Sequence, residues 1–121
     1  MFAISSGSRF YLYTAATDMR RGFDGLAGLV RQHLKADPLS GDVFIFINRA
    51  RDRIKLLVWD RTGYWVMYKR LEGGRFHLPA AKEDAVSRAL LYEEVVMLLE
   101  GIELTSIRRR KRFQKGVGMR R

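Results

Sequence analysis

Hydrophobic residues recur with two different periods along the chain, and the first stretches predict a strand followed by a helix. The aromatic-rich run 9–13 follows a segment of Ser and Gly, which is typical of a loop that leads into a strand. Thr17 and Asp18 can accept hydrogen bonds from the free amides of a helix start, and beyond them apolar residues recur at steps of three and four over residues 19–34. We expect an amphipathic helix that ends at Asp37-Pro38, because proline disfavours helical geometry in the residue before it.

Three further hydrophobic runs predict strands. Every residue of 43–47 is apolar, so both faces of this strand should be covered, as in the centre of a sheet. Residues 53–59 alternate in the manner of a second strand, and the β-prone run 64–70 follows after a turn at 60–63 in which Gly63 is free to take positive φ. The last two strands should therefore pair antiparallel.

The final apolar stretch predicts a second helix. Helical spacing begins at Tyr92, and Gly101 stands where a left-handed residue would end the helix. Between the turn at 72–74 and this helix, residues 75–77 are expected to extend the sheet briefly, whereas 79–84 are expected to form a surface loop. The predicted fold is α+β: a single compact domain over residues 1–107, with an antiparallel sheet of about four strands and two main helices.

The net charge of +10 is concentrated at the end of the chain, because residues 108–121 contain eight basic side chains and no acidic one. Apolar periodicity stops after Leu104, so we expect a basic C-terminal tail, 108–121, that is disordered when free. Phosphate groups of a duplex match such a tail, whereas the alternative is a solvated end that aids solubility or makes nonspecific RNA or membrane contacts. The candidate nucleic-acid-binding residues of the tail are Arg108, Arg109, Arg110, Lys111, Arg112 and Lys115.

A second basic cluster consists of Arg49, Arg51, Arg53 and Lys55, which are spaced by two. If the strand register extends back through Arg49, all four side chains project from one face and form a DNA-binding surface; the alternative is an ordinary solvated sheet face. Adjoining cations would extend this surface: Arg61, Lys69, Arg70 and Arg75. Neighbouring aromatic residues suit either stacking on unpaired bases or a place in the core: Trp59, Trp65 and Tyr68.

The sequence contains no clear set of catalytic residues. The chain has no cysteine, which excludes disulfides, thiolate zinc sites and cysteine nucleophiles, and neither His33 nor His77 lies in a metal-ligand or nucleophile motif. Several aspartates could in principle form a two-metal cluster that cuts phosphodiesters, but most flank turns or helix starts, where aspartate caps backbone amides: Asp18, Asp24, Asp37, Asp42, Asp52 and Asp60. We therefore expect no enzyme activity, no cofactor and no metal.

The N-terminal segment lacks the cationic leader and apolar stretch of an export signal, and no apolar run approaches the roughly 20 residues that span a bilayer. We expect a cytoplasmic protein without membrane contact.

Five motifs in order carry a resemblance to a known family. They are TDMRRGFDGL at 17–26, DPLSG at 37–41, DRIKLL at 52–57 with Trp59-Asp60, YKRLE at 68–72 with Gly74-Arg75-Phe76, and MLLEGI at 97–102. Over residues 8–112 the chain resembles the TnpB accessory proteins of the insertion sequence 66 family. The resemblance implies a cytoplasmic protein, encoded by a mobile element and needed for transposition beside a larger transposase that carries the catalytic acidic residues.

The chain departs from this family at the start of the last helix. Relatives usually have Ser or Thr there, whereas this chain has Leu91 before Tyr92. If the helix begins earlier, Ser87 is the alternative cap.

Three functions remain to be distinguished. The first is a noncatalytic accessory protein whose partner is DNA, either the element ends or nonspecific duplex. The second is an adaptor that docks on the transposase without independent DNA binding, its tail assisting only by long-range attraction. The third is a metal-dependent nuclease that uses the aspartates.

Overall fold

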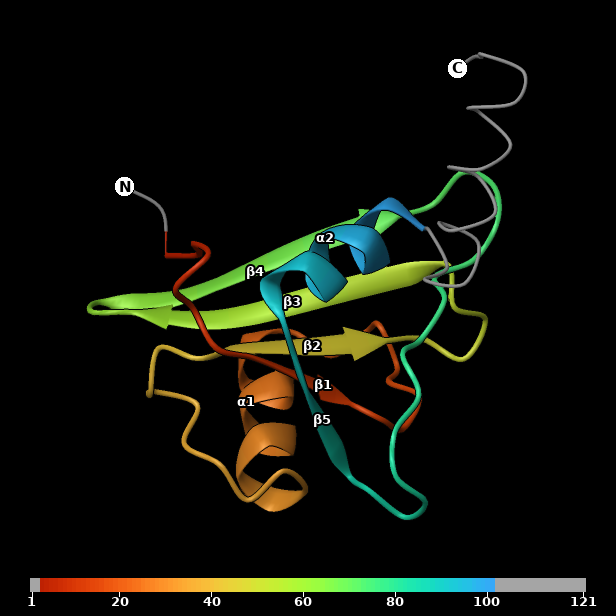
Figure 1. Ribbon diagram of the computed structural model, residues 1–121. Helices are drawn as coiled ribbons and strands as arrows, with labels where there is room; N and C mark the ends of the chain where they lie inside the picture. The colour runs from red at the N-terminus through yellow and green to blue at the C-terminus, as the bar shows by residue number, and fades with distance from the viewer. Residues whose placement is uncertain (1–2, 102–121) are drawn as a thin grey trace.

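A five-stranded sheet lies between two helices in the computed structural model, which describes residues 3–101 (Figure 1). The strands stand in the order β4-β3-β2-β1-β5 across the sheet. In chain order the elements are β1 (Phe10–Tyr13), α1 (Phe23–Gln32), β2 (Val43–Ile47), β3 (Arg53–Asp60), β4 (Gly63–Arg70), β5 (Ser87–Leu90) and α2 (Tyr92–Glu100). The expected α+β fold with two main helices is confirmed.

Strand β2 is central and buried on both faces, as its unbroken apolar run predicts. Its odd-numbered side chains pack with Val95 and Leu98 of α2, whereas Phe44 and Phe46 pack with Leu26 of α1. Because successive strand residues point to opposite faces, the two helices cover opposite faces of the sheet. The molecule therefore has two cores, one on each side of β2.

The sheet is mixed, so the prediction of an antiparallel sheet of about four strands is wrong in two respects. Strand β1 pairs with β2 in parallel, because α1 serves as the crossover that returns the chain to the same end of the sheet. Strand β5, which the sequence analysis did not identify, pairs antiparallel with β1. The segment 75–77 forms no strand: Phe76 is buried, and its amide donates to the Arg51 carbonyl oxygen at 2.7 Å.

Helix α1 is shorter at both ends than its apolar spacing predicts. It begins at Phe23 after Gly22, and neither Thr17 nor Asp18 caps it. Its end is set by Lys35, which adopts a φ of 54°, and by the Ala36 amide, which donates to the Val30 carbonyl at 3.1 Å. A left-handed residue of this kind ends the helix before the proline can act.

The β3–β4 hairpin forms as predicted, with Asp60 opposite Gly63. The positive φ of the turn falls on Arg61, at 46°, and not on Gly63. The expectation for Gly63 is therefore wrong.

Lys55 is buried, with 8% of its surface exposed, although it stands at a position where strand alternation predicts a solvated side chain. Its ammonium donates to the carbonyl oxygens of Met19 and Arg21, both at 2.8 Å, and lies 4.6 Å from the centroid of the Tyr68 ring. Hydrogen bonds and the ring thus compensate the burial of this charge. Lys55 joins β3 to the segment that leads into α1.

Helix α2 spans the residues predicted for it and ends at Gly101, which has a φ of 75°. Leu91 occupies the N-cap position and Ser87 lies in β5, so the alternative cap is wrong. The Glu94 carboxylate accepts the Leu91 amide at 2.8 Å and pairs with the Arg88 guanidinium at 3.0 Å. Burial would raise the pKa of Glu94, but the hydrogen bonds from Arg88 and Leu91 outweigh it and hold this pKa below its ordinary value.

No helix among residues 3–101 is long and apolar enough to cross a membrane. The expected tail, 108–121, with its candidate residues Arg108, Arg109, Arg110, Lys111, Arg112 and Lys115, lies outside the described residues.

Leu91→Ser should stabilise the protein by about 1 kcal/mol, because the Leu91 backbone already has the extended N-cap geometry and lacks only a side-chain acceptor. The leucine side chain is 67% exposed, so its loss costs little packing. Urea unfolding of Leu91→Ser beside Leu91→Ala measures the effect. An equal midpoint for the two variants would contradict the assignment of the cap.

Lys55→Met should destabilise the protein by about 2 kcal/mol, because it leaves two backbone carbonyls without their charged donor. Lys82→Met, at an exposed lysine, is the matched control and should change stability by less than about 0.5 kcal/mol. The measurement is urea unfolding at one pH. Equal effects of the two substitutions would show that the Lys55 contacts contribute nothing to folding.

Candidate nucleic-acid interface

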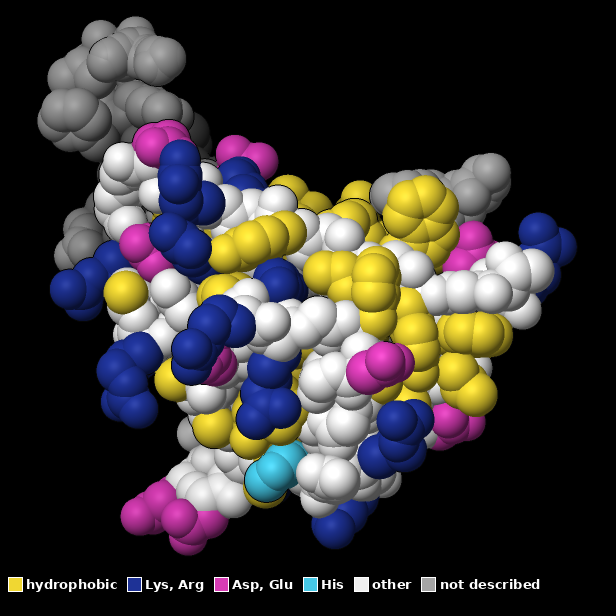
Figure 2. Space-filling model, turned by 180° about the vertical axis from the view of Figure 1, so that it is seen from behind, with side chains coloured by type: hydrophobic (Ala, Val, Ile, Leu, Met, Phe, Trp, Pro, Cys, Tyr) yellow, Lys and Arg dark blue, Asp and Glu magenta, His cyan; other side chains and the backbone are white. Residues whose placement is uncertain are grey.

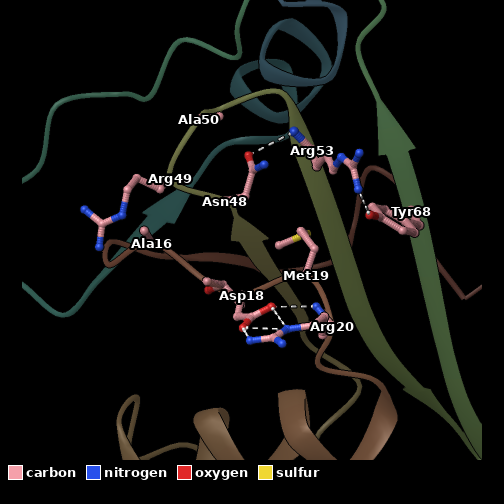
Figure 3. A pocket seen from close by; sticks show the side chains of 10 residues that line it. Ala16, Asp18, Met19, Arg20, Asn48, Arg49, Ala50, Arg53 and Tyr68 are labelled. Carbon is pink, nitrogen blue, oxygen red and sulfur yellow. Dashed lines mark hydrogen bonds and ion pairs between the residues drawn. The ribbon is translucent and has the colours of Figure 1, made fainter.

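The carboxyl ends of β1 and β2 lie at the same edge of the sheet, because the two strands are parallel. The segments that follow them enclose a hollow of about 600 Å³, which β3 and β4 complete (Figure 3). Ligands of open α/β sheets bind at this kind of edge, outside the carboxyl ends of strands. The lining residues are Ala16, Thr17, Asp18, Met19, Arg20, Asn48, Arg49, Ala50, Arg53 and Tyr68.

Asn48 organises the β2–β3 connection. Its side-chain carbonyl accepts the amides of Asp52 and Arg53, both at 3.0 Å, and its side-chain nitrogen donates to the Asp52 carboxylate at 2.7 Å. The Asn48 amide donates to the Arg53 carbonyl at 3.1 Å, which closes the loop. One side chain thus fixes the turn that carries the arginines.

The predicted alternation of basic residues does not extend back from Arg53. Strand β3 begins there, and Arg51 lies in the loop with a φ of 61°. Arg49 and Arg51 are both exposed, and neither forms an ion pair with a carboxylate among residues 3–101. Figure 3 shows the Arg49 side chain extending from the loop on the opposite side of the hollow from Arg53 and pointing away from it.

Lys55 and several adjoining cations do not join this group. The ammonium of Lys55 is enclosed beneath Tyr68, so the prediction that Lys55 belongs to the DNA-binding surface is wrong. Lys69 points to the other face of the sheet and donates to the Leu99 carbonyl at 2.8 Å, where it complements the C-terminal end of α2. Arg61 lies at the hairpin turn, whereas Arg70, which pairs with Glu72 at 2.9 Å, lines a neighbouring hollow together with Arg53 and Tyr68.

Tyr68 is the aromatic residue of the hollow and is 51% exposed. Its hydroxyl accepts a hydrogen bond from the Arg53 guanidinium at 3.2 Å, which raises the pKa of Arg53. The other two candidates lie elsewhere: Trp59 packs edge-on against Tyr64 at 5.1 Å, and Trp65 is on the opposite face of β4.

Asp18 and Arg20 form the lower wall of the hollow in Figure 3. The Arg20 guanidinium donates to the Asp18 carboxylate at 2.6 Å, and the Arg20 amide donates to it at 2.9 Å. These hydrogen bonds lower the pKa of Asp18 to about 2, so the carboxylate stays ionised at physiological pH. From the sequence, Asp18 was considered only as a metal ligand or a helix cap, and Arg20 and Asn48 were not identified as site residues; only the position of Asn48 after the buried strand gave a signal.

Two smaller hollows continue from the first. One of about 190 Å³ shares Arg49 with it, and another of about 340 Å³ shares Arg53 and Tyr68. Figure 2, which views the molecule from behind, shows many Lys and Arg side chains toward one side and hydrophobic side chains gathered toward the other. The loop 48–52 therefore borders adjoining hollows whose linings include Arg49, Arg51 and Arg53.

Within the described part of the chain, no group of three or more His, Cys, Asp or Glu side chains is arranged to hold a metal ion. Asp42 pairs with Arg9 at 3.0 Å, Asp37 accepts the Leu39 amide, and Asp52 binds Asn48. These are local structural contacts.

The described chain ends beside the same loop. A β-carbon added to Gly101 would lie 3.6 Å from Leu71 Cδ1. The Leu71 amide in turn donates a hydrogen bond to the Asp52 carbonyl at 2.8 Å. The chain thus leaves α2 close to the β2–β3 connection.

Comparison with known proteins identifies the family. Residues 8–109 match the family described as IS66 Orf2 like protein. Two proteins of Sinorhizobium fredii (strain NBRC 101917 / NGR234) are similar: uncharacterized protein y4jC is 36% identical over 110 residues, covering 91% of this chain and 92% of that protein. Uncharacterized protein y4hO is 38% identical over 95 residues, covering 78% and 81%. No solved structure matches. The chain belongs to the IS66 Orf2-like family of insertion-sequence accessory proteins.

Proposed function

We propose that the protein is a noncatalytic accessory factor of insertion-sequence transposition that acts in the cytoplasm and binds DNA at the edge of the sheet. The observation that carries the proposal is the pair of exposed guanidiniums, Arg49 and Arg51, which no described carboxylate neutralises. Guanidinium groups suit phosphate because they can donate two parallel hydrogen bonds to its oxygens.

The cations of the tail, 108–121, follow Gly101 closely in the sequence. Arg108 is seven residues beyond Gly101, a contour of at most about 25 Å. Gly101 itself is close to Leu71, which is hydrogen-bonded to the loop 48–52. The loop arginines and the cations of residues 108–121 can therefore contact one duplex together. Contacts of this kind hold and orient DNA without reading its sequence.

The transposase adaptor remains a second candidate because α2 exposes apolar side chains. Leu91, Tyr92 and Val96 are 67%, 41% and 42% exposed; Leu91 and Tyr92 lie at the start of the helix and Val96 lies in its middle. Apolar groups gathered on a surface are typical of a protein contact. In this function the transposase is the direct partner and holds the DNA.

The binding of duplex DNA should weaken with salt, with a slope of log K against log salt of about −5 if about six cations contact phosphates. Replacing Arg49 and Arg51 together by Gln should make the slope less steep by about 2, from about 0.9 per contact. Replacing the eight tail cations by Gln in the full-length chain should reduce it further. Fluorescence anisotropy with element-end DNA and an unrelated duplex of equal length measures these slopes.

The matched control replaces Arg31 and Arg61 by Gln, which removes the same charge from exposed positions away from the hollow. Its slope should equal that of the wild type. An equal reduction in both double variants would contradict the proposed surface and would indicate a general effect of net charge. DNA binding that requires added transposase would favour the adaptor.

A further inference from the structure

We propose that the hollow beside Tyr68 receives an unpaired nucleotide of DNA, with the base stacked on the Tyr68 ring and the phosphate held by Arg53. This inference rests on the proposed DNA binding and specifies the form of DNA that the site takes. It combines three features of the hollow: a fixed aromatic ring, cations on the rim, and a concave shape.

The ring of Tyr68 is held in place before any ligand binds. The Lys55 ammonium lies 4.6 Å from its centroid, and the Arg53 guanidinium donates to its hydroxyl at 3.2 Å. Lys55 is itself anchored by two carbonyl oxygens at 2.8 Å. Although Tyr68 is held at these points, it remains 51% exposed. A side chain ordered in this way loses little conformational entropy when a base stacks on it.

The charges around the hollow favour an anion. Its lining contains three guanidiniums, from Arg20, Arg49 and Arg53, and one carboxylate, from Asp18. Asp18 already has a partner in Arg20, at 2.6 Å, so the other two guanidiniums are not neutralised within the hollow. Arg53 keeps further donors besides the one that binds Tyr68, because a guanidinium has five N–H groups.

The shape of the site favours an unpaired nucleotide over a base within a duplex. The hollow, about 600 Å³, is within the usual range of small-molecule sites. Tyr68 lines this concave region. Bases inside a duplex are stacked on one another, so they offer no free face to an aromatic ring. A single strand, a flap or an extruded nucleotide can bring a base and its phosphate into the hollow together.

The test compares fluorescein-labelled oligothymidylate with a labelled blunt duplex of equal length, by anisotropy at one salt concentration. Tyr68→Ala in the full chain should weaken oligothymidylate binding about 5- to 100-fold, the usual effect of losing one stacked base, and should change duplex binding by less than about twofold. Tyr68→Phe should retain most of the affinity. Tyr68→Leu, which keeps an apolar side chain on the strand, should behave like Tyr68→Ala.

Trp65→Ala is the matched control, since Trp65 lies on the same strand, is 48% exposed and points to the opposite face. It should leave both affinities within about twofold of the wild type, and circular dichroism checks that every variant is folded. Equal effects of Tyr68→Leu and Trp65→Ala on the affinity for oligothymidylate would overturn this inference. If the wild-type protein still binds the duplex in that case, the proposed function stands. Failure of the wild-type protein to bind either DNA would overturn both.

Discussion

The burial of β2 on both faces is the constraint on which the rest of the structure depends. Five consecutive apolar side chains cannot be covered by one layer, so α1 must lie on one face and α2 on the other. Covering the first face with α1 as a crossover makes β1 and β2 parallel. Their carboxyl ends then meet at one edge of the sheet, where Asn48 fixes a loop that carries Arg49 and Arg51. The basic hollow is therefore a consequence of how the core is covered.

Lys55 connects this core to the hollow. Its ammonium satisfies two carbonyls of the segment before α1 and supports the ring of Tyr68, so one buried charge stabilises the fold and positions an exposed aromatic side chain. Arg53, two residues earlier on the same face of β3, holds the hydroxyl of that ring. Alternation along β3 places both cations correctly on one face but cannot say that one is buried and the other is half-exposed, because that depends on a segment more than thirty residues away in sequence.

The sequence predicts those features that depend on local pattern. The strand at 43–47, the hairpin, the second helix and its end at Gly101 follow from apolar periodicity and turn residues. The parallel pairing of β1 and β2 and the short strand β5 do not, because pairing partners are distant contacts and Ser87–Leu90 has no distinctive alternation. The predicted start of α1 lies too early in the sequence because Asp18 is a residue type that often caps helices. In the structure, Asp18 instead binds Arg20 in a turn before the helix. Of the site, Arg49, Arg51 and Arg53 were identified from spacing, although the loop and not a continuous strand brings them together.

We propose that DNA contacts the edge of the sheet around the loop 48–52. A titration of the ¹⁵N-labelled full-length protein with a short DNA duplex, followed by amide chemical shifts, provides the test. We predict that the largest shifts among residues 3–101 fall on the segments 16–20 and 48–53, while amides of the hairpin turn near Arg61 stay unchanged. Shifts confined to α2 and its exposed apolar residues, with none around the loop 48–52, would contradict it.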